Sequence, residues 1–327
     1  MHAFHPPRMA AARPMPAATG AKAAPAFARP PSVRDDRGRP RRVGLEMEFQ
    51  GIGARAAASA LAQAFGGTLR EEDPHAFHIA DTALGRLSVE LDMRYAHPQR
   101  TDATPRVRLG AAGAAWLGTL LGRVVPRELV TAPLDLDALD RVDRAVGVLR
   151  AAGARGRGAT LFGSLGLHFN VDPVSLEPRA ITAVLKAFLL LNRSLRRGIA
   201  ERGPAHLPPM AYLPAPYPDS YVRRVVAPDY RPELPALIDD YLDANPSRDR
   251  DLDMLPMFLH LDPERVRARL PYEKIGSRAV FHYRLPRAHV SDPDWSIAEA
   301  WNGWVAVERL AADPGRLEAL GRARATR

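Results

Sequence analysis

The segment RRVGLEMEFQGIG, residues 41–53, constrains the fold most strongly because its apolar and polar residues alternate. Successive side chains of an extended strand point to opposite faces. One face of this segment is therefore apolar and carries Val43, Leu45, Met47 and Phe49. Glu46 and Glu48 leave from the other face, where two like charges disfavour each other. The segment predicts a strand with one buried face and one face that meets either solvent or a cation.

Three later segments repeat this alternation, with an apolar face opposite a face of chemically reactive groups. The polar sets are Ser88, Glu90 and Asp92 in residues 85–95; Gly166, His168, Asn170 and Asp172 in residues 159–172; and Arg278, His282 and Arg284 in residues 277–287. Antiparallel sheets often have one solvated face, which is the simpler explanation. Asp and Asn are depleted in strands, however, so their repeated placement favours a functional sheet face.

Glu46, Glu48 and Glu90 supply the negative charge of this predicted face. Unless a cation lies among them, their mutual repulsion raises a pKa or destabilises the sheet. The chain has no cysteine, so a bound metal must use oxygen or imidazole ligands, which favours Mg²⁺ or Mn²⁺. The three glutamates are the predicted metal ligands.

Arg278 and Arg284 supply positive charge to the same predicted face. The planar guanidinium fork matches the geometry of phosphate and carboxylate, so both are candidates for anion binding. His168 and Asn170 add an imidazole and an amide between the acidic and basic groups. Acidic residues for metal and arginines for phosphate together suit a nucleoside triphosphate lying on a sheet.

The rest of the chain alternates irregularly between strands and helices. Helices are expected at residues 54–65, 107–123, 135–152, 177–200 and 294–312, with two or three short ones between 233 and 270. This mixed order predicts one α+β domain over residues 41–312, with a curved, mainly antiparallel sheet and helices packed on one face. Trp295, Trp301 and Trp304 fall at helical spacings and are expected in the core.

The two ends of the chain are expected to be tails. Residues 1–40 are rich in Ala, Pro and Arg and lack apolar periodicity, which predicts a disordered basic segment. An Arg-rich leader also resembles an organellar transit peptide, but its prolines disfavour the amphipathic helix of such peptides. Residues 313–327 are interpreted as a C-terminal tail.

The formal net charge is +9, which raises the question of nucleic-acid binding. Lysine occurs only at positions 22, 186 and 274, and residues 1–34 hold five basic residues and no acidic one. This distribution is typical of an Arg-rich composition and does not indicate a basic patch for nucleic acid. No apolar run reaches the roughly 18–20 residues of a membrane span, so we expect a soluble protein without a membrane partner. The absence of cysteine fits a cytoplasmic location.

Four segments in chain order, VGLEMEF, LSVELD, GLHFNVD and AVFHYRLP, resemble the successive strands of the amidoligase family. That family belongs with the glutamine synthetase-like and glutamate–cysteine ligase-like carboxylate–amine ligases. The resemblance covers residues 41–312 and implies a sheet of the glutamine synthetase-like type. It implies ATP-dependent joining of a small-molecule or peptide carboxylate to an amine through an acyl phosphate.

The resemblance also implies roles for individual residues. It implies that Glu46, Glu48 and Glu90 bind Mg²⁺ or Mn²⁺, and that His168 lies near the metal and the phosphates. Arg284 corresponds to the phosphate-facing arginine. The predicted catalytic residues are Glu46, His168 and Arg284, and the predicted ATP-binding residues are Arg278, Arg284 and Asn170. The chain departs from the family at His282, where the family often has Glu.

Alternative functions remain open at this point. A non-catalytic binding or scaffold protein would keep the sheet without full metal coordination, and a metal-dependent hydrolase would use the same acidic residues without nucleotide. The segment GIGARA, residues 51–56, resembles a dinucleotide-binding turn, but Glu46 and Glu48 would be costly in the doubly buried strand that such a turn follows. No G-x-x-x-x-G-K-[ST] motif occurs, which excludes a P-loop enzyme. The oligomeric state leaves no signal in the sequence.

Overall fold

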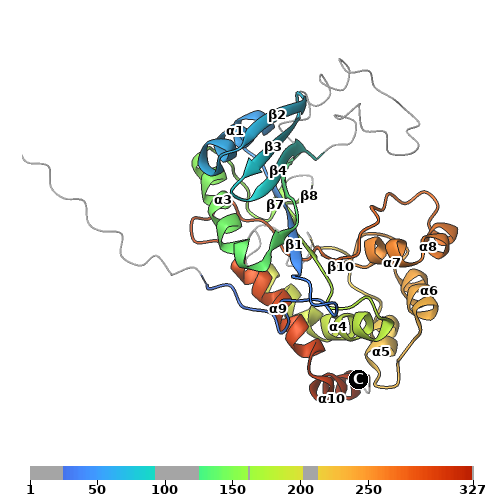
Figure 1. Ribbon diagram of the computed structural model, residues 1–327. Helices are drawn as coiled ribbons and strands as arrows, with labels where there is room; N and C mark the ends of the chain where they lie inside the picture. Colours follow the sequence, from blue (N-terminus) through green and yellow to red (C-terminus); the bar gives the residue numbers. More distant parts are fainter. Residues whose placement is uncertain (1–24, 93–124, 161–162, 202–212, 326–327) are drawn as a thin grey trace, which may run out of the picture.

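The computed structural model describes residues 25–92, 125–160, 163–201 and 213–325, which Figure 1 draws in colour. Within these residues the chain forms an α+β fold around a nine-stranded sheet, and the strand pairs are antiparallel. The predicted α+β class and mainly antiparallel sheet are confirmed. The expected helix at 107–123 lies outside the described residues.

The main sheet runs in the order β10, β11, β9, β1, β5, β4, β3 and β2, and β6 also pairs with β1. Its strands are β1 (Arg42–Phe49), β2 (Thr68–Asp73), β3 (Ala76–Thr82), β4 (Gly85–Leu91), β5 (Arg127–Thr131), β6 (Leu134–Asp135), β9 (Leu167–Val171), β10 (Leu252–Asp253) and β11 (Phe281–Tyr283). A separate ribbon pairs β7 (Ala159–Thr160) with β8 (Gly163–Ser164). The central strand β1 is the one whose alternation is clearest in the sequence.

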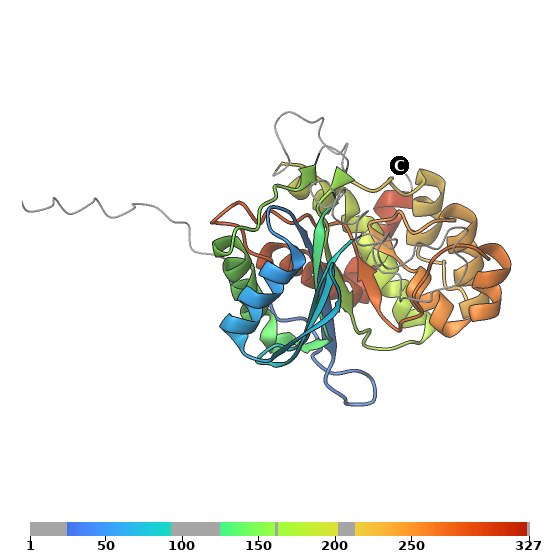
Figure 2. The same cartoon turned by 90° about the horizontal axis from the view of Figure 1, so that it is seen from above.

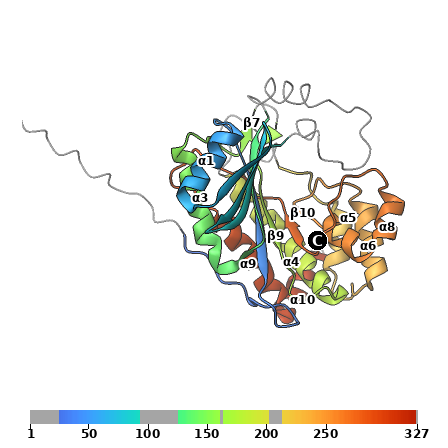
Figure 3. The same cartoon turned by 45° about the horizontal axis from the view of Figure 1, so that its top comes forward.

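The helices lie beside the sheet and next to its β10 end (Figure 2 and Figure 3). They are α1 (Ala54–Phe65), α3 (Leu139–Ala151, after a 3₁₀ turn at Leu136–Ala138), α4 (Pro178–Ala200), α5 (Asp219–Val226), α6 (Leu234–Ala244), α7 (Leu255–Leu261), α8 (Pro263–Arg269), α9 (Ala298–Ala311) and α10 (Pro314–Ala325). Figure 2 shows α1 and α3, in blue and green, on one side of the sheet. Figure 3 shows α5, α6 and α8 gathered next to the β10 end of the sheet. No helix of the described residues has both the length and the apolar character of a membrane span.

The core lies between the apolar sheet face and the helices. The apolar side chains of β1 are at most 1% exposed: Val43, Leu45, Met47 and Phe49. From α9, the Trp301 ring lies 5.9 Å from Phe169 and the Trp304 ring 5.6 Å from Tyr283, measured between centroids. The tryptophans are buried, as the sequence predicts. Because the apolar residues of β1 and β9 face these helices, the polar residues of the two strands lie on the opposite face of the sheet.

The prediction of a disordered tail is wrong for residues 25–40. Phe27 and Ala28 pack against the core. Ala28 N donates to Asn302 Oδ1 at 2.7 Å, and Trp301 Nε1 donates to the Ala28 carbonyl at 2.9 Å. The segment lacks apolar periodicity because it packs as an irregular strap, with residues 26–29 bonded to α9 and a turn at residues 36–38, and it forms no helix or strand with periodic burial.

The interpretation of residues 313–327 as a tail also needs correction. Residues Pro314–Ala325 form α10, which contacts α4, α5 and α9. Leu317 is 8% exposed. The strand expected at 277–287 is shorter, since only Phe281–Tyr283 pair in the sheet. Arg278 and Arg284 therefore lie on the loops that flank β11.

Candidate functional site

The register of the sheet brings the predicted acidic residues to one face. Glu46 lies opposite His168 on β9, and Glu48 lies opposite Glu128 on β5. Glu128 in turn lies opposite Glu90 on β4. Directly opposed residues of antiparallel strands point to the same face. Glu46, Glu48 and Glu90 thus share one face of one sheet, with Glu128 between the last two.

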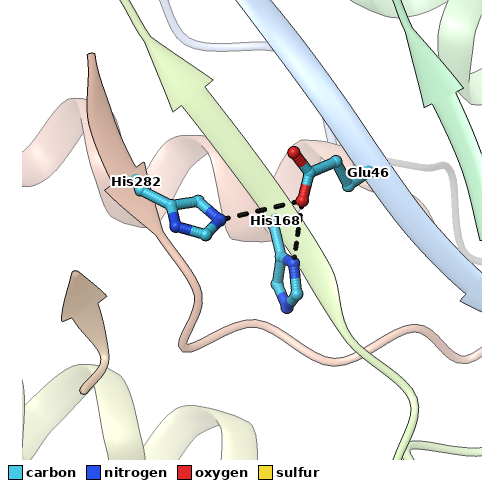
Figure 4. A group of neighbouring side chains, drawn as sticks. All are labelled: Glu46, His168 and His282. Carbon is cyan, nitrogen blue, oxygen red and sulfur yellow. Dashed lines mark hydrogen bonds and ion pairs between the residues drawn. The ribbon is translucent and has the colours of Figure 1, made fainter. Parts of the chain in front are cut away.

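Glu46 is the centre of the site, and Figure 4 shows dashed lines from both imidazoles meeting at one oxygen of its carboxylate. Its Oε1 accepts hydrogen bonds from Asn170 Nδ2 at 2.8 Å and from an Arg278 guanidinium nitrogen at 3.1 Å. Its Oε2 lies 3.4 Å from His168 Nδ1 and 3.7 Å from His282 Nε2. Burial alone would raise the pKa of Glu46, but its contacts with the two histidines outweigh burial and hold the pKa well below its usual range. Glu46 is therefore ionised.

His168 is buried beside this carboxylate. Burial lowers the pKa of His168 to about 4 despite the nearby charge of Glu46, so the imidazole is neutral at physiological pH. A neutral imidazole has a lone pair, which metal binding requires. Gly166 makes room for the ring: a Cβ at this position would lie 2.4 Å from His168 Nε2.

His282 on β11 faces the same carboxylate oxygen of Glu46 and is 2% exposed. Its Nδ1 lies 3.3 Å from Asp253 Oδ2, across the β10–β11 pair. Asp253 is fully buried, and Arg248 Nε donates to its Oδ2 at 3.0 Å. The sequence places His282 on the polar face but gives it no role, and it does not reveal Asp253 as its partner.

Glu48 and Glu128 form the more acidic part of the face. Glu48 Oε2 accepts a hydrogen bond from the Gly166 N–H at 2.8 Å. Burial, with a smaller contribution from the charge of Asp92, raises the pKa of Glu48 to about 7. Burial and then the charge of Glu46 raise the pKa of Glu128 well above its usual range. Such shifts are typical of a surface that is arranged to receive a cation.

Sequence reasoning missed Glu128. It lies in RELVT, a five-residue segment that directly follows Pro126 and in which Glu128 and Val130 alternate with Leu129. That alternation was the available signal, but it is too short to distinguish a strand from a loop. Asp92, which closes the β4 segment on the same predicted face, is exposed at the end of the described region.

The two arginines lie on either side of β11. One guanidinium nitrogen of Arg278 donates to Glu46, and Arg284 donates through its NH1 group to the Arg248 carbonyl. Burial is the main cause of the pKa shifts at Glu48 and His168. The charge of Arg284 opposes the rise of the Glu48 pKa and adds to the fall of the His168 pKa. The Nε–H groups of Arg278 and Arg284 are buried without a hydrogen-bond partner among the described residues. Unpaired buried donors of this kind fit an anionic ligand.

Glu46, His168 and His282 are the described side chains whose potential metal-ligating atoms form a group of three within 4.8 Å of one another. This group differs from the predicted set, because Glu48 and Glu90 share the face but do not belong to it. The site can therefore offer nitrogen ligands beside Glu46 and carboxylate ligands along the neighbouring strands.

Comparison with known protein families gives a match. A family model described as "Putative amidoligase enzyme" matches residues 39–306, which span the sheet, the site and most of α9. No curated protein matches the chain.

Proposed function

Since the chain belongs to the amidoligase family, we propose that it is an ATP- and divalent-cation-dependent ligase that joins a carboxylate to an amine. The observation that carries the proposal is the arrangement around Glu46. One of its oxygens is held by Arg278, the other faces two imidazoles, and the acidic row of β1, β5 and β4 lies beside it on the same sheet face. We also propose that this sheet is of the glutamine synthetase-like type.

The residues fit a divalent cation. Glu46 is ionised, His168 is neutral, and His282 Nε2 is buried without a hydrogen-bond partner among the described residues. Glu48 and Glu90 add carboxylates on the same face. When bound, Mg²⁺ or Mn²⁺ would screen the negative charge of the phosphates and of the leaving group.

The remaining steps use the chain's own groups. Arg284 and Arg278 would bind the ATP phosphates through their unpaired Nε–H donors, and Asn170 would support Glu46. A substrate carboxylate held there attacks the γ-phosphorus, which forms an acyl phosphate and releases ADP. An amine then attacks the acyl carbon, phosphate leaves, and the amine loses one proton. Arginines that bind phosphate more strongly as charge shifts lower the barrier to the first step.

A decisive variant for this proposal is Arg284→Ala. We expect it to fold and to lower ATP turnover by roughly two orders of magnitude, the scale of losing one electrostatic stabiliser. Arg284→Lys should restore only part of the rate, because a point charge does not replace a bidentate fork. Arg223→Ala, on the exposed side of α5, is the matched control. The assay is ADP release with ATP, Mg²⁺ or Mn²⁺, and a panel of amino acids and amines.

The outcomes separate the proposal from its alternatives. If folded Arg284→Ala turns over ATP at the rate of the parent, Arg284 does not bind the phosphates. Absence of nucleotide binding by the parent with either metal indicates a scaffold protein. Metal-dependent hydrolysis of amide or ester substrates without nucleotide indicates a hydrolase that uses the same acidic residues.

A further inference from the structure

We propose that Glu46, His168 and His282 form a carboxylate–imidazole metal centre that prefers a nitrogen-binding first-row cation such as Mn²⁺, Co²⁺ or Zn²⁺ over Mg²⁺, with Asp253 as the residue that orients His282. The inference deepens the proposed function, because it names which cation the ligase site selects. The metal binding itself is measurable without any ligase activity.

The spacing of the three side chains supports a shared ion. Glu46 Oε2 lies 3.4 Å from His168 Nδ1 and 3.7 Å from His282 Nε2. The distance of 3.7 Å between His282 Nε2 and Glu46 Oε2 is too long for a hydrogen bond. Two ligands of a tetrahedral ion with bonds of about 2.0–2.1 Å lie about 3.4 Å apart. The atoms are therefore spaced as ligands of one ion, within the 4.8 Å that encloses all three.

His282 Nε2 gives an independent indication. In the part of the chain that the structure describes, this nitrogen is buried and has no hydrogen-bond partner. A buried polar atom without a partner is costly and calls for an explanation. A cation at the centre of the triangle would bind its lone pair and remove that cost.

Asp253 decides which nitrogen of His282 carries the proton. Its Oδ2 lies 3.3 Å from His282 Nδ1, so a proton on Nδ1 can be donated to this carboxylate, which leaves Nε2 as the nitrogen available to a cation beside Glu46. Asp253 is itself held by Arg248 Nε at 3.0 Å and by the Leu255 N–H at 3.0 Å. A carboxylate behind a metal-binding histidine fixes the tautomer and ring orientation in this way. Asp253 is thus a positioning residue.

The donor set determines the selectivity. Mg²⁺ requires hard oxygen ligands and near-octahedral geometry, whereas imidazole suits first-row transition metals. Two of the three ligands are imidazoles. We therefore expect affinity to rise from Mg²⁺ to Mn²⁺, Co²⁺ and Zn²⁺.

The test uses the full-length chain, freed of metal and without nucleotide. Calorimetric titration with Mg²⁺, Mn²⁺ and Zn²⁺ and optical titration with Co²⁺ should show at least about tenfold tighter binding of Zn²⁺ than of Mg²⁺. Asp253→Asn should weaken Zn²⁺ and Co²⁺ binding by about 10–100-fold. Asp253→Glu should recover part of that loss. His260→Gln, exposed on α7, is the control and should bind metal like the parent.

Two further measurements keep the inference falsifiable if a variant unfolds. When Zn²⁺ is added to the metal-free parent, imidazole ¹⁵N spectra should show a shift of the His282 Nε2 signal, with the proton of the metal-bound ring on Nδ1. His282→Glu replaces one nitrogen ligand by oxygen and should move the preference toward Mg²⁺. If His282 is doubly protonated and its ¹⁵N signals do not change when Zn²⁺ is added, Glu46 and Asp253 bind an imidazolium and the metal centre is rejected.

The outcomes also separate this inference from the proposed function. Equal affinity for Mg²⁺ and Zn²⁺ would contradict the predicted metal selectivity. A Co²⁺ spectrum that His282→Glu leaves unchanged would show that His282 is not a ligand. Parent-like Zn²⁺ binding by Asp253→Asn overturns the role of Asp253. If the protein binds Zn²⁺ as described but never turns over ATP, the metal centre is supported and the proposed ligase function is rejected.

Discussion

Gly166 and His168 are in such close contact that no larger residue fits at position 166. A Cβ on Gly166 would lie 2.4 Å from His168 Nε2 and 3.2 Å from Glu48 Oε1. The glycine also donates its N–H to Glu48. The backbone of Gly166 thus determines where the side chains of His168 on β9 and Glu48 on β1 lie.

Gly166→Ala should therefore displace the His168 ring. We expect a loss of stability of about 1–3 kcal/mol from overpacking and a loss of metal affinity, because His168 Nδ1 moves away from Glu46. Denaturant unfolding and Mn²⁺ titration are the measurements. Gly147→Ala, on α3 where an added Cβ meets nothing within 4 Å, is the control and should gain up to about 1 kcal/mol. Parent-like Mn²⁺ binding by Gly166→Ala would show that the ring is not confined.

The raised pKa of Glu48 predicts a pH dependence of stability. The folded-state value of about 7 lies above the ordinary value of 4.5, so between them the folded state binds more protons than the unfolded state. The free energy of unfolding of the metal-free protein should fall as the pH rises through this window. Glu48→Gln should remove that part of the fall, so its stability exceeds that of the parent above pH 7.

Chemical denaturation between pH 4.5 and 8 in a chelating buffer checks this expectation. Glu264→Gln, exposed on α8, should keep the parent's slope. Identical slopes in the parent and Glu48→Gln would mean that Glu48 is ionised throughout the window. Added Mn²⁺ should stabilise the parent more at pH 8 than at pH 5, because binding requires deprotonated ligands.

The docked strap at residues 25–40 predicts a stability difference between two truncations. A chain that begins at residue 39 should melt roughly 2–4 °C or more below one that begins at residue 25, since it loses Phe27, Ala28 and their contacts with Trp301 and Asn302. Asn302→Ala in the longer chain should reproduce part of the drop. Equal melting temperatures would show that the strap contributes nothing to the fold.

The local pattern of apolar and polar residues is enough to predict some elements of the fold but not others. Helix α1 begins and ends where its apolar spacing and the following Gly66 predict, and the face assignment of β1 and β9 needs only the period of two. The strap at residues 25–40 could not be predicted, because its partners Trp301 and Asn302 lie more than 270 residues away in the sequence.

The candidate site shows the same division. The polar face of Glu46, Glu48, Glu90, His168 and Asn170 follows from alternation, but register and partner choice do not. Asp253 lies 29 residues from His282 in a two-residue strand, too short to leave a pattern of its own. The group of Glu46, His168 and His282 exists only because β11 and β1 both pair with β9.

The most direct test of the central claim follows oxygen from a substrate carboxylate into phosphate. The parent is incubated with ATP, Mg²⁺ or Mn²⁺, amines, and a panel of carboxylates labelled with ¹⁸O, and the released phosphate is analysed by mass spectrometry. Attack of the carboxylate on the γ-phosphorus followed by amine displacement predicts one labelled oxygen per phosphate, formed together with an amide. Phosphate that takes its oxygen from water, with both labelled oxygens left on the carboxylate and no amide formed, would contradict the ligase mechanism.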